Sequence, residues 1–218
     1  MSRNDVIAVQ VALGLLPDGH LGPASRRRIL ESVKDSIPTM PDPEAPLHVR
    51  AVRFCLVEAE KWGKVRVPKE WVAEYFRACQ RGEKNIGEWL AGEVLSGKHH
   101  SFCAAAIGFA ERAVARPGEK LAPARAGAAE YMIDAQNGIR GSWQPASKVT
   151  AFNHPLAGDL AIYTRPGGHH VEAVAYAVPN GYSSVGANEQ GGRWIVDSAL
   201  LPYNAERLLG FVRYVRSV

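Results

Sequence analysis

The sequence predicts an α+β fold in which helices come first and an antiparallel sheet follows. Between residues 47 and 114 the apolar residues recur at helical spacing, whereas beyond Gly158 short segments rich in β-branched and aromatic residues alternate with Gly, Pro and Asn. Residues 37–46 hold four prolines in ten positions, which is typical of an extended linker. We therefore expect a small helical domain at 1–36, the linker at 37–46 and the α+β domain at 47–218.

The helices expected in the α+β domain cover 47–62 and 69–79, and a third helix follows. It begins at Ser101, whose hydroxyl can cap it, and brings Cys103 into its first turn. Five strands are then expected, each bounded by turn-forming residues. They lie at 159–164, 170–178, 182–188, 193–198 and 211–216.

Composition and charge exclude several classes of function. No run approaches the roughly 20 apolar residues that cross a bilayer, and a start with Arg3, Asp5 and Gln10 is unlike a secretory signal. The net charge is +4, but the densest basic run is the three arginines at 26–28, so no nucleic-acid partner is expected. We expect a monomer made in the cytoplasm, without a signal peptide and without membrane insertion.

The first candidate catalytic residue is Cys103. A thiol attacks as thiolate, and a helix N-terminus beside a histidine lowers the thiol pKa. The other two cysteines, Cys55 and Cys79, fall inside expected helices, where a buried structural role is the usual one. Three cysteines without a C-x-x-C spacing do not indicate a disulfide framework or a zinc site.

The second candidate is His170, which follows the turn formed by Gly167 and Gly168. Alternation along the strand puts His170 and Glu172 on one face and His169 on the other. A histidine at the start of a strand can reach a helix N-terminus and accept the thiol proton.

A third residue is needed to hold the imidazole, and the sequence leaves its identity open. Asn188, at the end of the next expected strand, can fix the tautomer through its amide oxygen. Glu172, Glu189 and Asp197 are rival candidates for the same task.

Metal and serine chemistry receive less support. The adjacent pairs His99-His100 and His169-His170 face opposite ways on a strand, and no H-E-x-x-H is present. A G-x-S-x-G elbow is absent as well. We expect no metal and no cofactor.

Taken in order, these segments resemble the CHAP-type and related papain-like peptidoglycan hydrolases of phage lysins and bacterial cell-wall enzymes. The resemblance covers about residues 47–218. The segments that carry it are SFCAAAIGFAERA, PLAGDLAIYTRPGGHHVEAVAYAV and YSSVGANEQ. It implies a papain-like fold, with helices packed on an antiparallel sheet, and no cofactor.

The same resemblance assigns roles to individual residues. Cys103 matches the nucleophile, His170 the general base and Asn188 the third member. Gly158 and Asp159 match structural positions. The chain departs from the family pattern at Glu172, where Gly is usual, and at the residue before Cys103, which is Phe where Trp is commoner.

The N-terminal segment VIAVQVALGLLPDGHLGPASRRRIL is similar to the core of the small helical peptidoglycan-binding domain. The resemblance assigns wall binding to Gln10, Asp18, Gly19 and Gly22. The match is partial, because the first part of the usual domain is missing.

The function expected from these observations is that of an endolysin-like, bacteriolytic peptidoglycan hydrolase. It would be a cysteine endopeptidase or an N-acetylmuramoyl-L-alanine amidase that reaches the wall after release or export. Two alternatives remain: a non-catalytic wall-binding or phage structural protein, and a secreted antibacterial effector with the same amidase chemistry.

Overall fold

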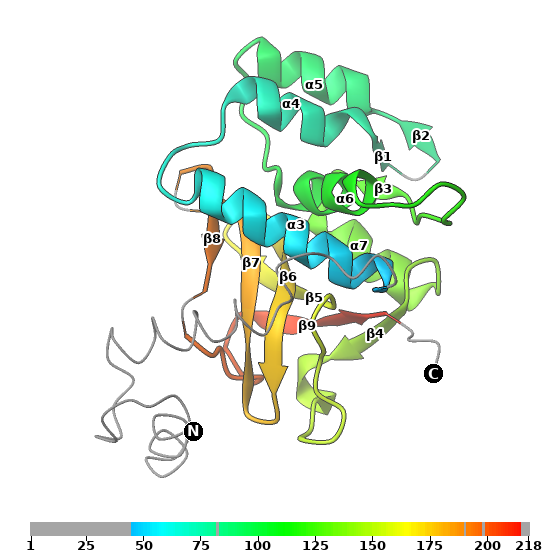
Figure 1. Ribbon diagram of the computed structural model, residues 1–218, viewed down its shortest axis with the longest axis vertical. Coiled ribbons are helices and arrows are strands. Elements are labelled where there is room, and N and C mark those ends of the chain that lie inside the picture. Colours follow the sequence, from blue (N-terminus) through cyan, green and yellow to red (C-terminus); the bar gives the residue numbers. More distant parts are fainter. Residues whose placement is uncertain (1–44, 82, 190, 198, 215–218) are drawn as a thin grey trace.

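The structure, a computed structural model, describes residues 45–214 apart from 82, 190 and 198, and it places helices against an antiparallel sheet (Figure 1). The predicted α+β class is confirmed for these residues. The segment 1–36, with the wall-binding candidates Gln10, Asp18, Gly19 and Gly22, lies outside them, as does almost all of the linker.

The main sheet has six strands in the order β4-β9-β5-β6-β7-β8, and all its neighbouring pairs are antiparallel. The five predicted strands are all present, and β4 is an additional short strand at the edge. Their bounds are Ser142–Pro145 for β4, Leu160–Arg165 for β5, Gly168–Val178 for β6, Gly181–Glu189 for β7, Arg193–Val196 for β8 and Leu208–Arg213 for β9.

Five α-helices and a short 3₁₀ helix lie within the described residues, and α3, α6 and α7 contact the main sheet. The α-helices are α3 (Leu47–Trp62), α4 (Lys69–Arg77), α5 (Gly87–Leu95), α6 (Cys103–Ala113) and α7 (Ala128–Gln136), and the 3₁₀ helix is η1 (Ala146–Lys148). Helices α4 and α5 pack on each other above α6 (Figure 1). No helix in the described part of the chain has the length and apolar content needed to cross a membrane.

Two predicted helix ends are wrong. The second helix stops at Arg77 instead of 79 because Cys79 begins β1 (Cys79–Arg81), which pairs with β2 (Lys84–Asn85) and β3 (Ala124–Arg125) in a small second sheet. The third helix starts at Cys103 with Phe102 as its N-cap residue, and no side chain caps it. Ser101 is therefore free for another role.

A buried carboxylate ties α3, α4 and β8 together. Glu58 is only 4% exposed, and its Oε2 accepts hydrogen bonds from the Trp62 and Trp71 indoles, at 3.1 and 2.6 Å, and from the Tyr75 hydroxyl at 2.6 Å. The Trp194 indole of β8 donates to the same tyrosine oxygen at 3.0 Å. Three donors on one carboxylate offset the cost of burying it.

Close packing also fixes helix α6, which carries Cys103. An added Cβ at Gly108 would lie 2.5 Å from the Ala124 Cβ and 3.0 Å from its Cα, so β3 and α6 approach as closely as glycine permits. The middle of α6 is thereby packed directly against the small sheet.

We expect Gly108→Ala to lower the free energy of unfolding by about 1–3 kcal/mol, because the added methyl group overpacks the contact with β3. The matched control is Gly92→Ala in α5, where nothing lies within 4 Å of the added Cβ. That change should raise stability by about 0.5–1 kcal/mol, since alanine favours a helix. Urea unfolding measures both, and an equal gain in the two variants would contradict the close contact.

Candidate active site

Cys103 is the first residue of α6, and its side chain is buried. The first backbone hydrogen bond of this turn runs from the Ala106 N–H to the Phe102 carbonyl, at 2.9 Å. The N–H groups of the preceding helical residues have no partner inside the helix, and they place partial positive charge at the thiol. The local sequence thus puts Cys103 where a thiolate is stabilised.

His170, on β6, faces this thiol from the sheet. It is 1% exposed, whereas His169 is exposed, as the alternation of the strand predicts. The imidazole lies close enough to Cys103 for the ring and the thiol to shift each other's pKa. The structure therefore brings together the two residues that the sequence singles out as nucleophile and base.

The pKa shifts of this pair favour the charged forms. Burial by itself would raise the pKa of the Cys103 thiol, but its hydrogen bond to His170 and the charge of that ring lower it below the ordinary value, with help from the Val171 N–H. Burial would likewise lower the pKa of His170, but hydrogen bonds to Cys103, Glu172 and Glu189 raise it above the ordinary value. A thiolate and an imidazolium therefore coexist over the pH range between the two pKa values.

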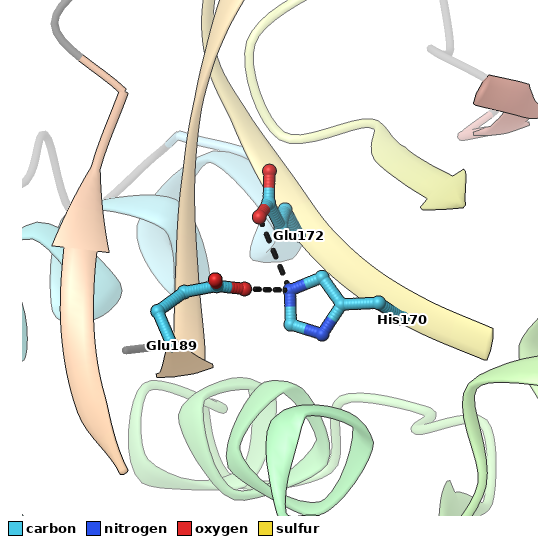
Figure 2. A group of neighbouring side chains, drawn as sticks. All are labelled: His170, Glu172 and Glu189. Carbon is cyan, nitrogen blue, oxygen red and sulfur yellow. Dashed lines mark hydrogen bonds and ion pairs between the residues drawn. The ribbon is translucent and has the colours of Figure 1, made fainter. Parts of the chain in front are cut away.

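Two carboxylates hold the other side of the ring. Nε2 of His170 lies 2.6 Å from Oε1 of Glu189 and 3.1 Å from Oε1 of Glu172. Figure 2 shows both carboxylates at this one nitrogen. Because Nε2 is occupied as a donor, Nδ1 is the nitrogen left for the thiol.

Asn188 does not hold the imidazole, so the predicted third member is corrected. Its Nδ2 donates to Ser101 Oγ at 2.9 Å, whereas the carboxylates in contact with Nε2 of the ring are those of the two glutamates. Val174 pairs with Ser184, and this register, if continued, would set Asn188 opposite His170. A β-bulge at the end of β7 intervenes: Asn188 adopts φ 65°, and Glu189 takes the place beside the ring.

Arg165 and Ser184 complete the carboxylate cluster. Arg165 forms an ion pair with Glu189 and lies 3.8 Å from Glu172 Oε1. Burial would raise the pKa of Glu189, but His170 and Arg165 together lower it, so this carboxylate stays ionised. Glu172 also accepts a hydrogen bond from Ser184 Oγ at 2.6 Å. Its side chain has room because residue 186 is glycine: a Cβ there would be 2.6 Å from Glu172 Cγ.

Asp197, another rival for the third position, lies one step further away. Its Oδ2 is 3.0 Å from Ser184 Oγ, so it reaches the cluster through this hydroxyl and not through the imidazole. Burial, followed by the charge of Glu172, raises the pKa of Asp197 to about 6. Ser184 has a single hydroxyl proton, so it can donate to only one of the two carboxylates. When it donates to Glu172, a protonated Asp197 is suited to donate its own proton to Ser184 Oγ.

Ser101 and Asn188 form a polar pair above the nucleophile. Ser101 Oγ lies 3.7 Å from Cys103 Sγ and accepts the amide hydrogen bond of Asn188. Both side chains are less buried than the thiol. This places a hydroxyl and an amide group beside the Cys103 sulfur, and polar donors of this kind can stabilise negative charge.

The three side chains around Nε2 also have the composition of a metal site. Among the described residues, His170, Glu172 and Glu189 are the group whose ligand atoms, all within 4.8 Å of one another, could hold an ion. A metal on Nε2 would replace the proton that the carboxylates now accept, and it would meet the cation of Arg165 at Glu189. The hydrogen-bonded arrangement satisfies all of these groups without a metal.

The two remaining cysteines are buried and lie away from this chemistry. Burial raises the pKa of both the Cys55 and the Cys79 thiol, which keeps them protonated. Arg165 and Ser184 were not identified from the sequence, and Ser101 was named only as a helix cap. The one available signal near them was Asn188, since asparagine tolerates the left-handed backbone of a bulge better than most residues.

We expect the alkylation rate of Cys103 by iodoacetamide to follow a pH midpoint below the ordinary thiol value of about 8.5, because the pKa of this thiol is lowered. The thiolate then persists as the pH falls and disappears only below that midpoint. Glu189→Gln should move the midpoint upward, since a weaker acceptor makes the imidazolium less stable. Peptide mass spectrometry after timed quenching identifies the labelled cysteine.

The matched control for that measurement is Glu206→Gln, which neutralises an exposed carboxylate in the loop before β9. It should leave the midpoint where it is in the wild type. If Glu189→Gln also leaves the midpoint unchanged, Glu189 does not tune the imidazole. An ordinary midpoint in the wild type would show that Cys103 is not activated.

Comparison of the chain with protein-family models, with curated proteins and with solved structures finds no match. What the described residues offer is a thiol at a helix N-terminus, an imidazole that faces it and two carboxylates on the far side of the ring.

Proposed function

We propose that the protein is a cysteine hydrolase that cuts an amide bond of bacterial peptidoglycan. The observation that carries the proposal is that His170 lies beside Cys103, so that each shifts the other's pKa, with the ring held from behind by Glu189 and Glu172. A nucleophile, a base and a group that orients the base make up the arrangement that covalent catalysis requires. A cysteine on a helix facing a histidine on a strand is also compatible with a papain-like fold.

In the proposed reaction the thiolate of Cys103 attacks the amide carbon, and the carbonyl oxygen becomes an oxyanion. Donors near the start of α6 and the Ser101–Asn188 pair are suited to stabilise that charge. His170 transfers its Nδ1 proton to the leaving amine as the carbon–nitrogen bond breaks. Water, deprotonated by the same nitrogen, then attacks the thioester and releases the acid and the thiol.

The substrate class is supported by the two sequence resemblances. The domain at 47–218 is similar to CHAP-type hydrolases, and the segment at 1–36 is similar to a peptidoglycan-binding domain. In this proposal Gln10, Asp18, Gly19 and Gly22 help to bind the wall, and the enzyme acts there as a monomer after release or export. The bond cut lies in the stem or cross-bridge peptide, or between the lactyl group and the first alanine.

Cys103→Ser should lower the rate of sacculus digestion by roughly a thousandfold or more, because a hydroxyl is not ionised by the same imidazole. Cys55→Ser and Cys79→Ser should stay active if they fold. Mass spectrometry of the released muropeptides measures the rate and identifies the new termini. Equal loss in all three variants with unchanged circular dichroism would remove Cys103 as nucleophile, and intact sacculi with the wild type would remove the proposed substrate.

EDTA should leave digestion unchanged while iodoacetamide abolishes it, since the proposed nucleophile is a thiolate and not a metal-bound water. The comparison is informative because His170, Glu172 and Glu189 could hold an ion. Activity that is lost in EDTA and restored by a divalent cation would instead favour a metal-dependent hydrolase.

A further inference from the structure

A cleft of about 360 Å³ lies between the segments that precede α4 and α6. Its apolar part is formed by Val67, Pro68, Val72, Val94 and Phe102. In Figure 1 these segments run from α3 to α4 and from α5 down to α6. The volume suits an amino-acid residue with a short side chain.

Every titratable side chain that lines the cleft is basic. These side chains are Arg66, Lys69, Lys98, His99 and His100. Lys98 is already paired with Glu93, outside the lining, at 2.8 Å, and Lys69 donates to the Leu95 carbonyl at 3.2 Å. Arg66 has no ion pair with any carboxylate of the described residues, so its guanidinium is available to an anion.

The cleft adjoins the candidate active site on two sides. On one side Phe102 lines it, and the next residue is Cys103. On the other side, the Val67 N–H donates to the Gly192 carbonyl at 2.9 Å, and the Gly192 N–H donates to the Glu189 carbonyl at 2.9 Å. Cys103 and His170 do not line the cleft themselves, but the cleft ends at the residue before Cys103 and borders the turn that follows Glu189.

We propose that this cleft binds a residue of the substrate peptide that carries a free carboxylate, next to the amide that Cys103 attacks. The proposal rests on the peptidase or amidase function proposed above. Arg66 pairs with the carboxylate, Lys69 adds positive charge, and the apolar wall accepts the short aliphatic part of the residue. Stem peptides of peptidoglycan contain free carboxylates beside their amide bonds, which gives the cleft a ligand of matching charge.

The test is binding of N-acetyl-L-alanyl-D-glutamate and of its uncharged diamide to the full chain carrying Cys103→Ala, measured by titration calorimetry. We expect the diacid to bind about tenfold more tightly than the diamide, the effect of one charge-assisted hydrogen-bonded pair. Adding Arg66→Gln should abolish most of that difference. Arg81→Gln, which neutralises an exposed arginine on β1 outside the cleft, should retain it.

Equal binding of diacid and diamide, or an undiminished difference with Arg66→Gln, would overturn the cleft assignment. Digestion of sacculi by the wild-type chain is measured separately and reports on the proposed function alone. If the sacculi stay intact while the Arg66-dependent preference persists, the function is wrong and the anion-binding cleft stands. If the sacculi are cut without that preference, the cleft assignment fails and the function stands.

Discussion

The hydrogen bonding of one imidazole nitrogen to two buried carboxylates is the interaction on which the rest of the site depends. Nε2 of His170 can satisfy Glu172 and Glu189 only while it carries a proton, and this directs Nδ1 toward Cys103. Charges that are removed from water are costly unless they are paired and hydrogen-bonded. Here the thiolate and the carboxylates meet two cations, His170 and Arg165, and the raised pKa of Asp197 keeps a further negative charge out of the cluster below about pH 6.

The fold supplies this arrangement through β6 and its neighbours. His170 and Glu172 are two residues apart on the same strand, so their separation is set by backbone geometry. The Val171 N–H between them lowers the pKa of the Cys103 thiol, and β6 contacts the helix α6 that carries this thiol. Gly186 on β7 leaves the space that the Glu172 side chain needs. Most of the site is therefore held by strands and a helix that pack directly against one another.

Much of the fold and the two central residues could be predicted from sequence, because each depends on local periodicity. Helical spacing located α3 and the helix of Cys103, and alternation separated His170 from His169. The helices α5 and α7 and the strands β1 to β4 were not predicted. Each of these strands has at most four residues, too few for a period to stand out. Periodicity could not choose among the four candidates for the third member, because a bulge changes which side chain reaches the ring, and the partners of Arg165 depend on contacts between strands far apart in the sequence.

The bulge at Asn188 has a consequence for how such a site is altered during evolution or redesign. Ala187 pairs with Trp194 and Glu189 with Arg193, so one extra residue on β7 decides which side chain arrives at the histidine. Removing a single residue from this stretch would restore regular alternation and present a different neighbour to the ring, although β6 and α6 would be unchanged. The number of residues in β7 therefore decides, as much as their identity does, which side chain contacts the histidine.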